Sequence, residues 1–255
     1  MKGKNLIAGI LVVVSLWAVV VWLVFASGIA ERPEPTMPLT VAAERGDAAL
    51  VRKLIAAGAD LNERDKSGYT ALVWAARNGN TEVAQALVEA RADMNARVCA
   101  RNGWTPLIHA IHKNNTDMAR LLIESGADVN AKAGNCTEKS VENGATALWH
   151  AAGEDNAEVV KALLAKGANP HAEYDSATAL SKAVAGAMDF SRPDDKQCPT
   201  ATVKALLAHA PDLTLKRSLW DRKSIFVAKH RGCTEMVKLL EERKQALAAK
   251  AVASN

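Results

Sequence analysis

One pattern recurs along the chain, and residues 105–131 show it most fully. Thr105 can cap a helix with its hydroxyl, and Pro106 suits the first helical position, where no amide hydrogen is needed. Apolar residues then recur at helical spacing in two runs separated by two asparagines. Gly126 ends the second run because glycine accepts the left-handed backbone of a helix C-terminus. The pattern predicts a helix, a short turn, a second helix and a projecting loop.

The same unit opens five times with a similar tripeptide, and a sixth opening is degenerate. The openings are Met37-Pro38-Leu39, Thr70-Ala71-Leu72, Thr105-Pro106-Leu107, Thr146-Ala147-Leu148, Thr178-Ala179-Leu180 and Lys223-Ser224-Ile225. In four copies the opening residue lies 23 positions before the Asp or Asn that closes the second helix, and the first two openings are 33 positions apart. A fixed period of this length indicates a stack of similar structural units.

The chain resembles the ankyrin-repeat family, whose 33-residue repeat has the signature T-P-L-H-x-A. The resemblance spans about residues 37–243. It implies an all-α solenoid of about six helix-turn-helix-loop units, in which each unit covers the apolar face of its neighbour. The chain departs from the signature at the histidine, where it has Val73, Ile108, Trp149 and Ser181.

The N-terminal region is apolar over residues 6–30 and follows two lysines, Lys2 and Lys4. About 20 apolar residues suffice for a helix to cross a bilayer, so we expect a transmembrane helix or uncleaved signal anchor. The positive-inside rule then puts residues 1–5 in the cytoplasm and the repeats on the periplasmic side of the inner membrane. The alternative is a cleaved signal peptide and a soluble periplasmic protein, but the apolar core of a signal peptide is usually only about 7–15 residues. The other predicted segments are a proline-rich spacer and a C-terminal tail, residues 31–36 and 244–255.

The four cysteines lie where the repeat is interrupted. Cys99 and Cys136 fall in the enlarged loops of the second and third units, which lie side by side in a stacked solenoid. Cys198 ends an insertion between the two helices of the fifth unit, and Cys233 lies in the matching turn of the sixth. Stacking order therefore predicts the disulfides Cys99–Cys136 and Cys198–Cys233, and an even cysteine count behind an export signal supports them. The alternatives are four free thiols in a cytosolic protein, or a zinc site, for which no C-x₂-C pair is present.

Neither charge nor motifs indicate catalysis. Lys2 and Lys4 are two of the 32 basic residues, so the exported part has 30 basic against 28 acidic residues, which is no footprint for nucleic-acid binding. There is no phosphate loop, nucleophile elbow or metalloprotease motif, so we expect no enzyme, no cofactor and no small-molecule substrate. An enzyme that uses the fifth-unit insertion is the alternative, but no catalytic constellation accompanies it.

Three histidines are candidate metal ligands. His109 and His112 are spaced i, i+3, and His150 follows in the next unit, so a metal pair is conceivable. However, His109 and His150 occupy the repeat position that holds Trp74, which is a packing position, and no thiol or carboxylate follows at ligand spacing. We therefore expect no metal site.

The family resemblance implies a protein-binding surface on the loop tips and the exposed ends of the first helices. The matching positions hold Lys66, Tyr69, Arg77, Asn78, Arg101, Trp104, His112, Lys113, Glu142, Glu154 and Tyr174. Tyr69 and Trp104 directly precede capping threonines, where packing does not require a large ring, so we expect them to be interface anchors. Basic residues on this surface favour a partner with an acidic surface.

Together these features predict a membrane-anchored, periplasm-facing protein that binds another protein. Bacterial relatives of this layout look like envelope proteins linked to peroxide defence, or like antagonists that neutralise an exported toxin. The alternative is a structural scaffold that holds an envelope membrane complex together.

Overall fold

The computed structural model describes residues 38–98, 102–134, 144–186, 198–215, 225–226 and 228–253. The chain forms two compact units, residues 1–38 and 39–255, and every helix described here belongs to the second unit. The helices are α2 (Leu39–Arg45), α3 (Ala48–Ala56), α4 (Ala71–Asn78), α5 (Thr81–Glu89), α6 (Pro106–His112), α7 (Thr116–Glu124), α9 (Ala147–Gly153), α10 (Ala157–Ala165), α11 (Ala179–Gly186), α12 (Thr200–His209) and α14 (Thr234–Ala253). Among these residues, extended pairing is limited to two isolated bridges, Lys132–Thr146 and Tyr174–Ala177.

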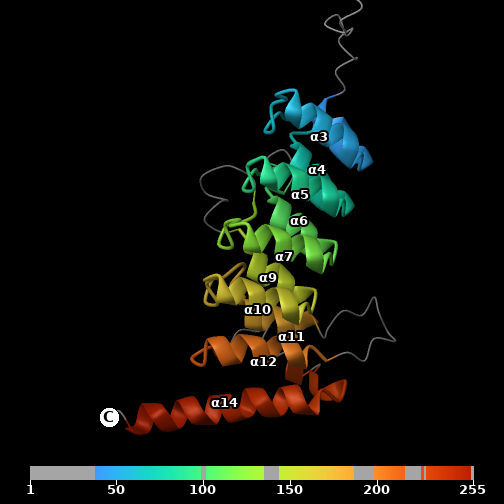
Figure 1. The fold of residues 1–255 in the computed structure, drawn as a ribbon. Coiled ribbons are helices and arrows are strands. Elements are labelled where there is room, and N and C mark those ends of the chain that lie inside the picture. Colours follow the sequence, from blue (N-terminus) through green and yellow to red (C-terminus); the bar gives the residue numbers. More distant parts are fainter. Residues whose placement is uncertain are drawn as a thin grey trace, which may run out of the picture. The chain divides into compact units, whose positions relative to one another are not determined.

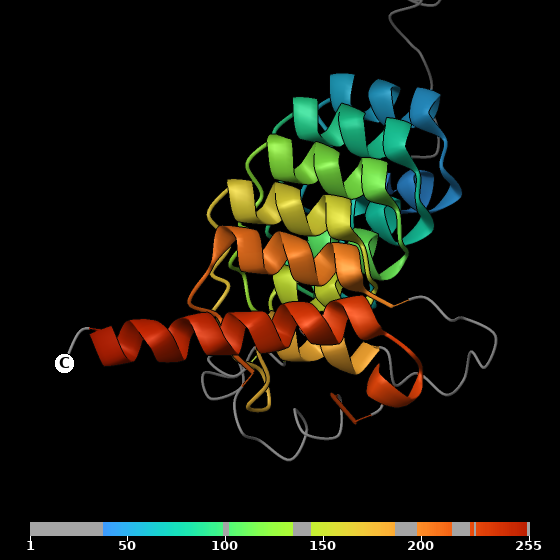
Figure 2. The same cartoon turned by 90° about the horizontal axis from the view of Figure 1, so that it is seen from below.

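The helices form two layers that follow the order of the units (Figure 1). The first helices α2, α4, α6, α9 and α11 pack one against the next, and the second helices α3, α5, α7, α10 and α12 do the same, with α14 against α12. Figure 2 shows the second helices stepping side by side from α3 to α12. For the described residues, the predicted all-α solenoid of helix-turn-helix-loop units is confirmed.

Local capping explains where the helices begin. The hydroxyls of Thr70, Thr105 and Thr146 accept backbone N–H groups three residues later at 3.4, 3.4 and 3.3 Å. The side chains of Asp47, Asn115 and Asn156 cap the second helices α3, α7 and α10 in the same way. Each such bond satisfies an N–H that the first turn of a helix leaves without a backbone partner.

The core lies between the two layers and consists mostly of leucine, valine and alanine. The leucine two positions after each opening residue is at most 1 % exposed in four successive units: Leu72, Leu107, Leu148 and Leu180. Burying one such side chain contributes roughly 1.5–3 kcal/mol. All four leucines belong to one core cluster that spans the units, so the stability of one unit depends on the next.

Hydrogen bonds also join the projecting loops. The side-chain oxygens of Asn62, Asn95 and Asn130 accept the backbone N–H of Asp93, Asp128 and Asn169 at 2.9, 2.9 and 2.8 Å. Each bond connects the loop of one unit to the corresponding loop of the next unit, so these bonds fix the spacing between the loops.

The predicted membrane segment lies outside the described residues, as do the spacer and the N-terminal residues 1–5. Within the described ranges, no helix combines the length and the apolar character needed to cross a bilayer. The anchor at residues 6–30 therefore stays a prediction.

The last helix extends past residue 243, where the sequence places the start of a C-terminal tail. Helix α14 runs from Thr234 to Ala253 without a break, so the residues assigned to a tail continue the last helix. Figure 2 shows α14 extending beyond the ends of the shorter helices. In the sixth unit residues 225–226 and 228–230 are helical, and residues 216–224 and 227 lie outside the described part of the chain.

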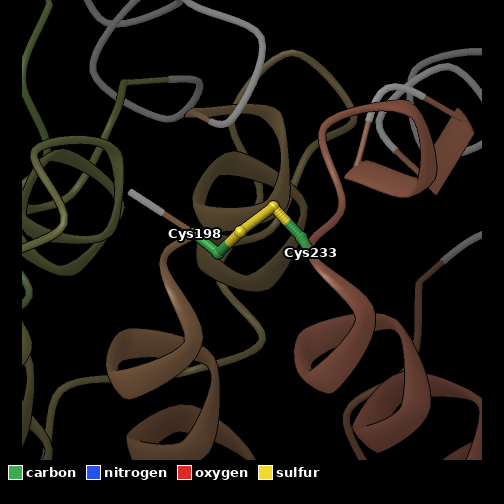
Figure 3. Close-up of a disulfide and its surroundings, with 2 residues drawn as sticks. All are labelled: Cys198 and Cys233. Carbon is green, nitrogen blue, oxygen red and sulfur yellow. A yellow bond between two sulfur atoms is a disulfide. The ribbon is translucent and has the colours of Figure 1, made fainter. Parts of the chain in front are cut away.

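The interruption of the fifth unit lies where the sequence predicts it. Helix α11 ends at Gly186 and α12 begins at Thr200, so the insertion separates the two helices of one unit. Cys198, at the end of this insertion, forms a disulfide with Cys233, and the two Cα atoms are 5.5 Å apart (Figure 3). The predicted pair Cys198–Cys233 is thus confirmed, whereas Cys99 and Cys136 lie outside the described residues and their pairing stays a prediction.

Removing this disulfide should loosen the C-terminal end. The double variant C198S/C233S is expected to lose about 2–4 kcal/mol of unfolding free energy, because the bond closes a loop in the unfolded chain across a sequence separation of 35 residues. Urea denaturation gives the loss, and amide hydrogen exchange locates it. We expect faster exchange in α12 and α14 and unchanged exchange in α4 and α5, so a uniform increase along the stack would contradict a local role.

Candidate functional site

A continuous series of ring contacts runs across the second to fifth units. We call it the ring ladder, and it comprises Tyr69, Trp74, Trp104, His109, His112, Trp149, His150 and Tyr174. Adjacent ring centroids are between 4.8 and 6.1 Å apart, a spacing at which edge-to-face and stacked pairs attract. The contacts cross every boundary between these units.

The repeat places these rings because it returns to the same place on each first helix. Trp74, His109 and His150 each stand four residues after a capping threonine, on α4, α6 and α9. The same position on α11 holds Lys182. Stacking of the first helices therefore aligns three rings and one cation in a row.

Cations lie against both ends of the row. The guanidinium of Arg77 lies 5.2 Å from the Tyr69 ring centre and 5.0 Å from that of Trp74. The Lys182 ammonium lies 4.6 Å from the centre of the Trp149 ring. Gly153 allows this contact, since a Cβ there would come within 2.6 Å of Lys182 Cε. Cations at this distance from an aromatic face are attracted to its negative potential.

The two inner histidines are held neutral at physiological pH. Burial lowers the pKa of His109 from 6.5 to about 4, and the charges of Arg77, His112 and Lys113 act in the same direction. Burial likewise lowers the pKa of His150 to about 4, with smaller contributions from His112 and Lys182. In both cases the charged imidazolium would be deprived of water and placed beside other cations.

Ring nitrogens of the ladder differ in their hydrogen bonding. Trp74 Nε1 donates to Asp65 Oδ2 at 2.8 Å. His112 Nδ1 lies 3.4 Å from Glu154 Oε1 in an ion pair that needs a protonated histidine. By contrast, three buried ring nitrogens in the described part of the chain have no hydrogen-bond partner: His109 Nε2, Trp149 Nε1 and His150 Nε2.

The expectation that Tyr69 is an exposed anchor is wrong. Its side chain is 3 % exposed and belongs to a small buried cluster. The cluster packs the ring against Val73 on α4 and against Ala96 and Val98, which come from the outgoing loop of the same unit. Packing therefore does require a large ring at this position. Tyr69 is buried beneath the predicted binding surface and is not exposed on it.

The other predicted residues are placed in three ways. Arg77, Trp104, His112, Glu154 and Tyr174 lie on the ring ladder or contact it directly. Lys66, Asn78 and Lys113 are exposed but make none of its ring contacts, and Asn78 Nδ2 donates to the Glu44 carbonyl at 2.9 Å. Arg101 and Glu142 lie outside the described residues, so their role stays a prediction.

Sequence reasoning misses part of this site. It assigns Trp74, His109 and His150 to packing, which their full or partial burial supports, but they also form the centre of the ladder. It does not single out Trp149 or Lys182 as site residues. The available signal is the recurrence of a ring four residues after three of the capping threonines, Thr70, Thr105 and Thr146.

The ladder consists mainly of aromatic rings and flanking cations. In the parts of the chain that the structure describes, no three His, Cys, Asp or Glu side chains are grouped so that they could hold a metal ion. The ladder provides half-buried aromatic side chains, Trp104 and Trp149, with the cations Arg77 and Lys182 beside its rings, and such aromatic and arginine side chains are enriched at protein interfaces.

Comparisons with known proteins agree with the architecture. Residues 39–133 match the family model described as ankyrin repeats in three copies, and residues 143–174 match the model of a single ankyrin repeat. The crystal structure of an ankyrin repeat domain from Acinetobacter baumannii AYE is similar, with 28% sequence identity and a TM-score of 0.65. That similarity covers 81% of this chain and 97% of the other. No curated protein matches the chain significantly.

Proposed function

The chain belongs to the ankyrin-repeat family, and we propose that it is a non-catalytic module that binds another protein through the ring ladder, tethered in the periplasm by its apolar N-terminal segment. Ankyrin repeats generally mediate protein–protein interaction and are typically not catalytic. The ladder is the observation that carries the proposal for this chain, because it extends a single aromatic strip over four units.

The exposed parts of the ladder suit protein recognition. Tyr174 is 38 % exposed, and Trp104 and Trp149 are half-buried. Arg77 adds a guanidinium beside two of the rings. Tryptophan, tyrosine and arginine are the residues that most often dominate binding energy at protein interfaces. Their half-buried rings are already held in place, so little side-chain entropy is lost when a partner binds.

Two features support the proposed location. Residues 6–30 form an uncharged apolar segment behind two lysines, as in an inner-membrane anchor. The Cys198–Cys233 disulfide joins two neighbouring units, and such bonds persist in the bacterial periplasm but are rare in the cytosol.

Site-specific photo-crosslinking in intact cells tests the proposal. A benzoylphenylalanine that replaces His112 is expected to give a defined adduct, because this exposed ladder residue would touch the partner. The matched control replaces Lys161, an exposed residue of the second helix α10, and should give no such adduct. Mass spectrometry of the adduct then identifies the partner and its compartment. Equal adducts at both positions would argue against the ladder as the contact surface, and a cytosolic partner would argue against the location.

A further inference from the structure

Unpaired donors and acceptors inside the ring ladder require an explanation. His109 Nε2, Trp149 Nε1 and His150 Nε2 are buried, and no described group accepts from or donates to them. Buried polar atoms in folded proteins are nearly always paired. His109 is only 6 % exposed, and Trp149 and His150 are adjacent in sequence, with ring centres 5.3 Å apart. The unpaired atoms are thus concentrated in the third and fourth units.

The second unit shows which chemical group satisfies such a ring. Trp74 Nε1 donates to Asp65 Oδ2 at 2.8 Å. The other carboxylate oxygen of Asp65 accepts the backbone N–H of Ser67 and of Tyr69 at 2.8 and 2.9 Å. An indole N–H is only a donor, and a carboxylate is only an acceptor when ionised, so the two are matched. Trp149 Nε1, in the fourth unit, has no such carboxylate among the described residues.

The charges around the fourth unit favour the same group. Lys182 lies over the Trp149 ring at 4.6 Å, and its charge and that of His112 both act on His150. Among the described residues, Asp65 is engaged with Trp74 and Glu154 with His112. The cations that lie against the rings, Arg77 and Lys182, are complementary to an acidic partner.

We propose that the part of the ladder formed by Trp149, His150 and Lys182 is the docking point for a carboxylate on an extended acidic segment of the partner protein. The carboxylate accepts a hydrogen bond from the indole N–H of Trp149. It also forms an ion pair with Lys182, whose ammonium moves from the face of the Trp149 ring to the carboxylate. The indole turns to expose Nε1, so the partner supplies in the fourth unit what Asp65 supplies in the second. This inference rests on the proposed function and names the chemistry of its partner.

Proton uptake is expected to accompany docking. Among the described residues, the groups placed against His150 are Trp104, which precedes α6, His112 at the end of α6, Lys182 from α11 and the neighbouring Trp149 of α9. These surroundings keep its imidazole neutral in the free protein. A carboxylate placed beside it favours the charged form, so the complex binds a proton that the free protein does not. Affinity should therefore increase as the pH falls from 7.5 to 5.5, by up to about tenfold per pH unit for one proton.

A peptide selection provides the probe. A phage library of random 12-residue peptides is selected against the full chain, and the affinity of the selected peptides is measured by fluorescence anisotropy. We expect selected peptides to contain Asp or Glu, and peptides with Gln at those positions to bind about tenfold more weakly or worse. Selection of neutral or basic peptides, or of none, would overturn the inference.

Matched variants locate the contact. Trp149→Phe keeps a ring and removes the unpaired N–H, so peptide affinity should fall about tenfold. Lys161→Gln changes an exposed residue of α10 that makes no ladder contact, so peptide affinity should stay unchanged. Lys182→Gln should weaken peptide binding. His150→Phe should abolish the pH dependence of peptide affinity, whereas His112→Gln should retain it. In parallel, the indole N–H resonance of Trp149 should shift on peptide addition, which tests the contact in the unaltered protein.

The outcomes separate this inference from the proposed function. If crosslinking at His112 captures a partner but Trp149→Phe binds peptides as tightly as the wild type, the carboxylate contact is wrong and protein binding stands. If His112 gives no adduct and no peptide is selected, both fail.

Discussion

Substituting Gly103 by alanine is expected to destabilise the protein by about 2–5 kcal/mol. Gly103 has a φ of +62°, and a Cβ there would lie 1.7 Å from the carbonyl oxygen of Gly134 in the next unit. That oxygen cannot move away freely, because Arg97 Nη2 donates to it at 3.0 Å and the Gly134 N–H donates to the Asn102 carbonyl at 2.8 Å. Alanine would therefore add steric overlap, about 1–3 kcal/mol or more, to the cost of a left-handed backbone, about 1–2 kcal/mol.

Gly68 provides a matched control in the second unit. It also lies two residues before a capping threonine and has a φ of +79°, but no atom lies within 4 Å of the place that an alanine Cβ would occupy. Gly68→Ala should therefore cost only the backbone term, about 1–2 kcal/mol. Urea denaturation followed by tryptophan fluorescence measures both variants. Equal losses would show that the backbones at Gly103 and Gly134 separate at little cost, which contradicts their close packing.

Local features of this fold could be predicted because short sequence motifs determine them. The capping hydroxyls of Thr70, Thr105 and Thr146 form the predicted hydrogen bonds, since a cap needs only the next three residues. The insertion between α11 and α12 was also predictable, because it changes a fixed spacing. The Cys198–Cys233 pair followed from stacking order alone.

Features that depend on contacts between loops and helices could not be predicted in the same way. The burial of Tyr69 depends on Ala96 and Val98, which the outgoing loop brings back over α4. The close approach of Gly103 to Gly134 arises because the loops of neighbouring units meet backbone to backbone. A glycine recurs two residues before the threonine as Gly68, Gly103 and Gly144. This spacing does not predict which copy meets a neighbouring backbone, since Gly68 has no atom within 4 Å of its Cβ position.

The ring ladder lies between these two cases. Trp74, His109 and His150 recur at a fixed place in the repeat, so the sequence spacing predicts their alignment. The spacing does not predict their functional role, because a ring at that position can equally well be an ordinary core residue. Only the contacts show that Trp104 touches His109, His112 and His150 at once and so connects the third unit to the fourth. Hydrogen bonding also separates Trp74 from Trp149, which composition cannot do.

The buried histidines should make folding strongly dependent on pH between about 4 and 6.5. The pKa values of His109 and His150 are lowered from 6.5 to about 4 in the folded protein. Over this interval the unfolded chain binds more protons than the folded one, so stability rises with pH and is lost as the pH falls. At pH 5, which is about 1.5 units below the unfolded pKa, each histidine has cost roughly 2 kcal/mol. The pair should therefore cost about 4 kcal/mol between pH 8 and pH 5.

The double variant H109F/H150F isolates this contribution. Phenylalanine keeps a ring in each place but cannot titrate, so the variant should lack the loss that the histidines cause between pH 8 and pH 5. It should also be more stable than the wild type at neutral pH, because the two unpaired Nε2 atoms are replaced by carbon and each had cost about 1–3 kcal/mol. Urea denaturation at several pH values measures both effects. The contribution of the carboxylates to the pH dependence is common to the two proteins, so it cancels in the comparison. If the wild type loses no more stability than the variant between pH 8 and pH 5, water or a proton reaches these imidazoles in the folded state. NMR titration of the His109 and His150 rings would then give pKa values near 6.5.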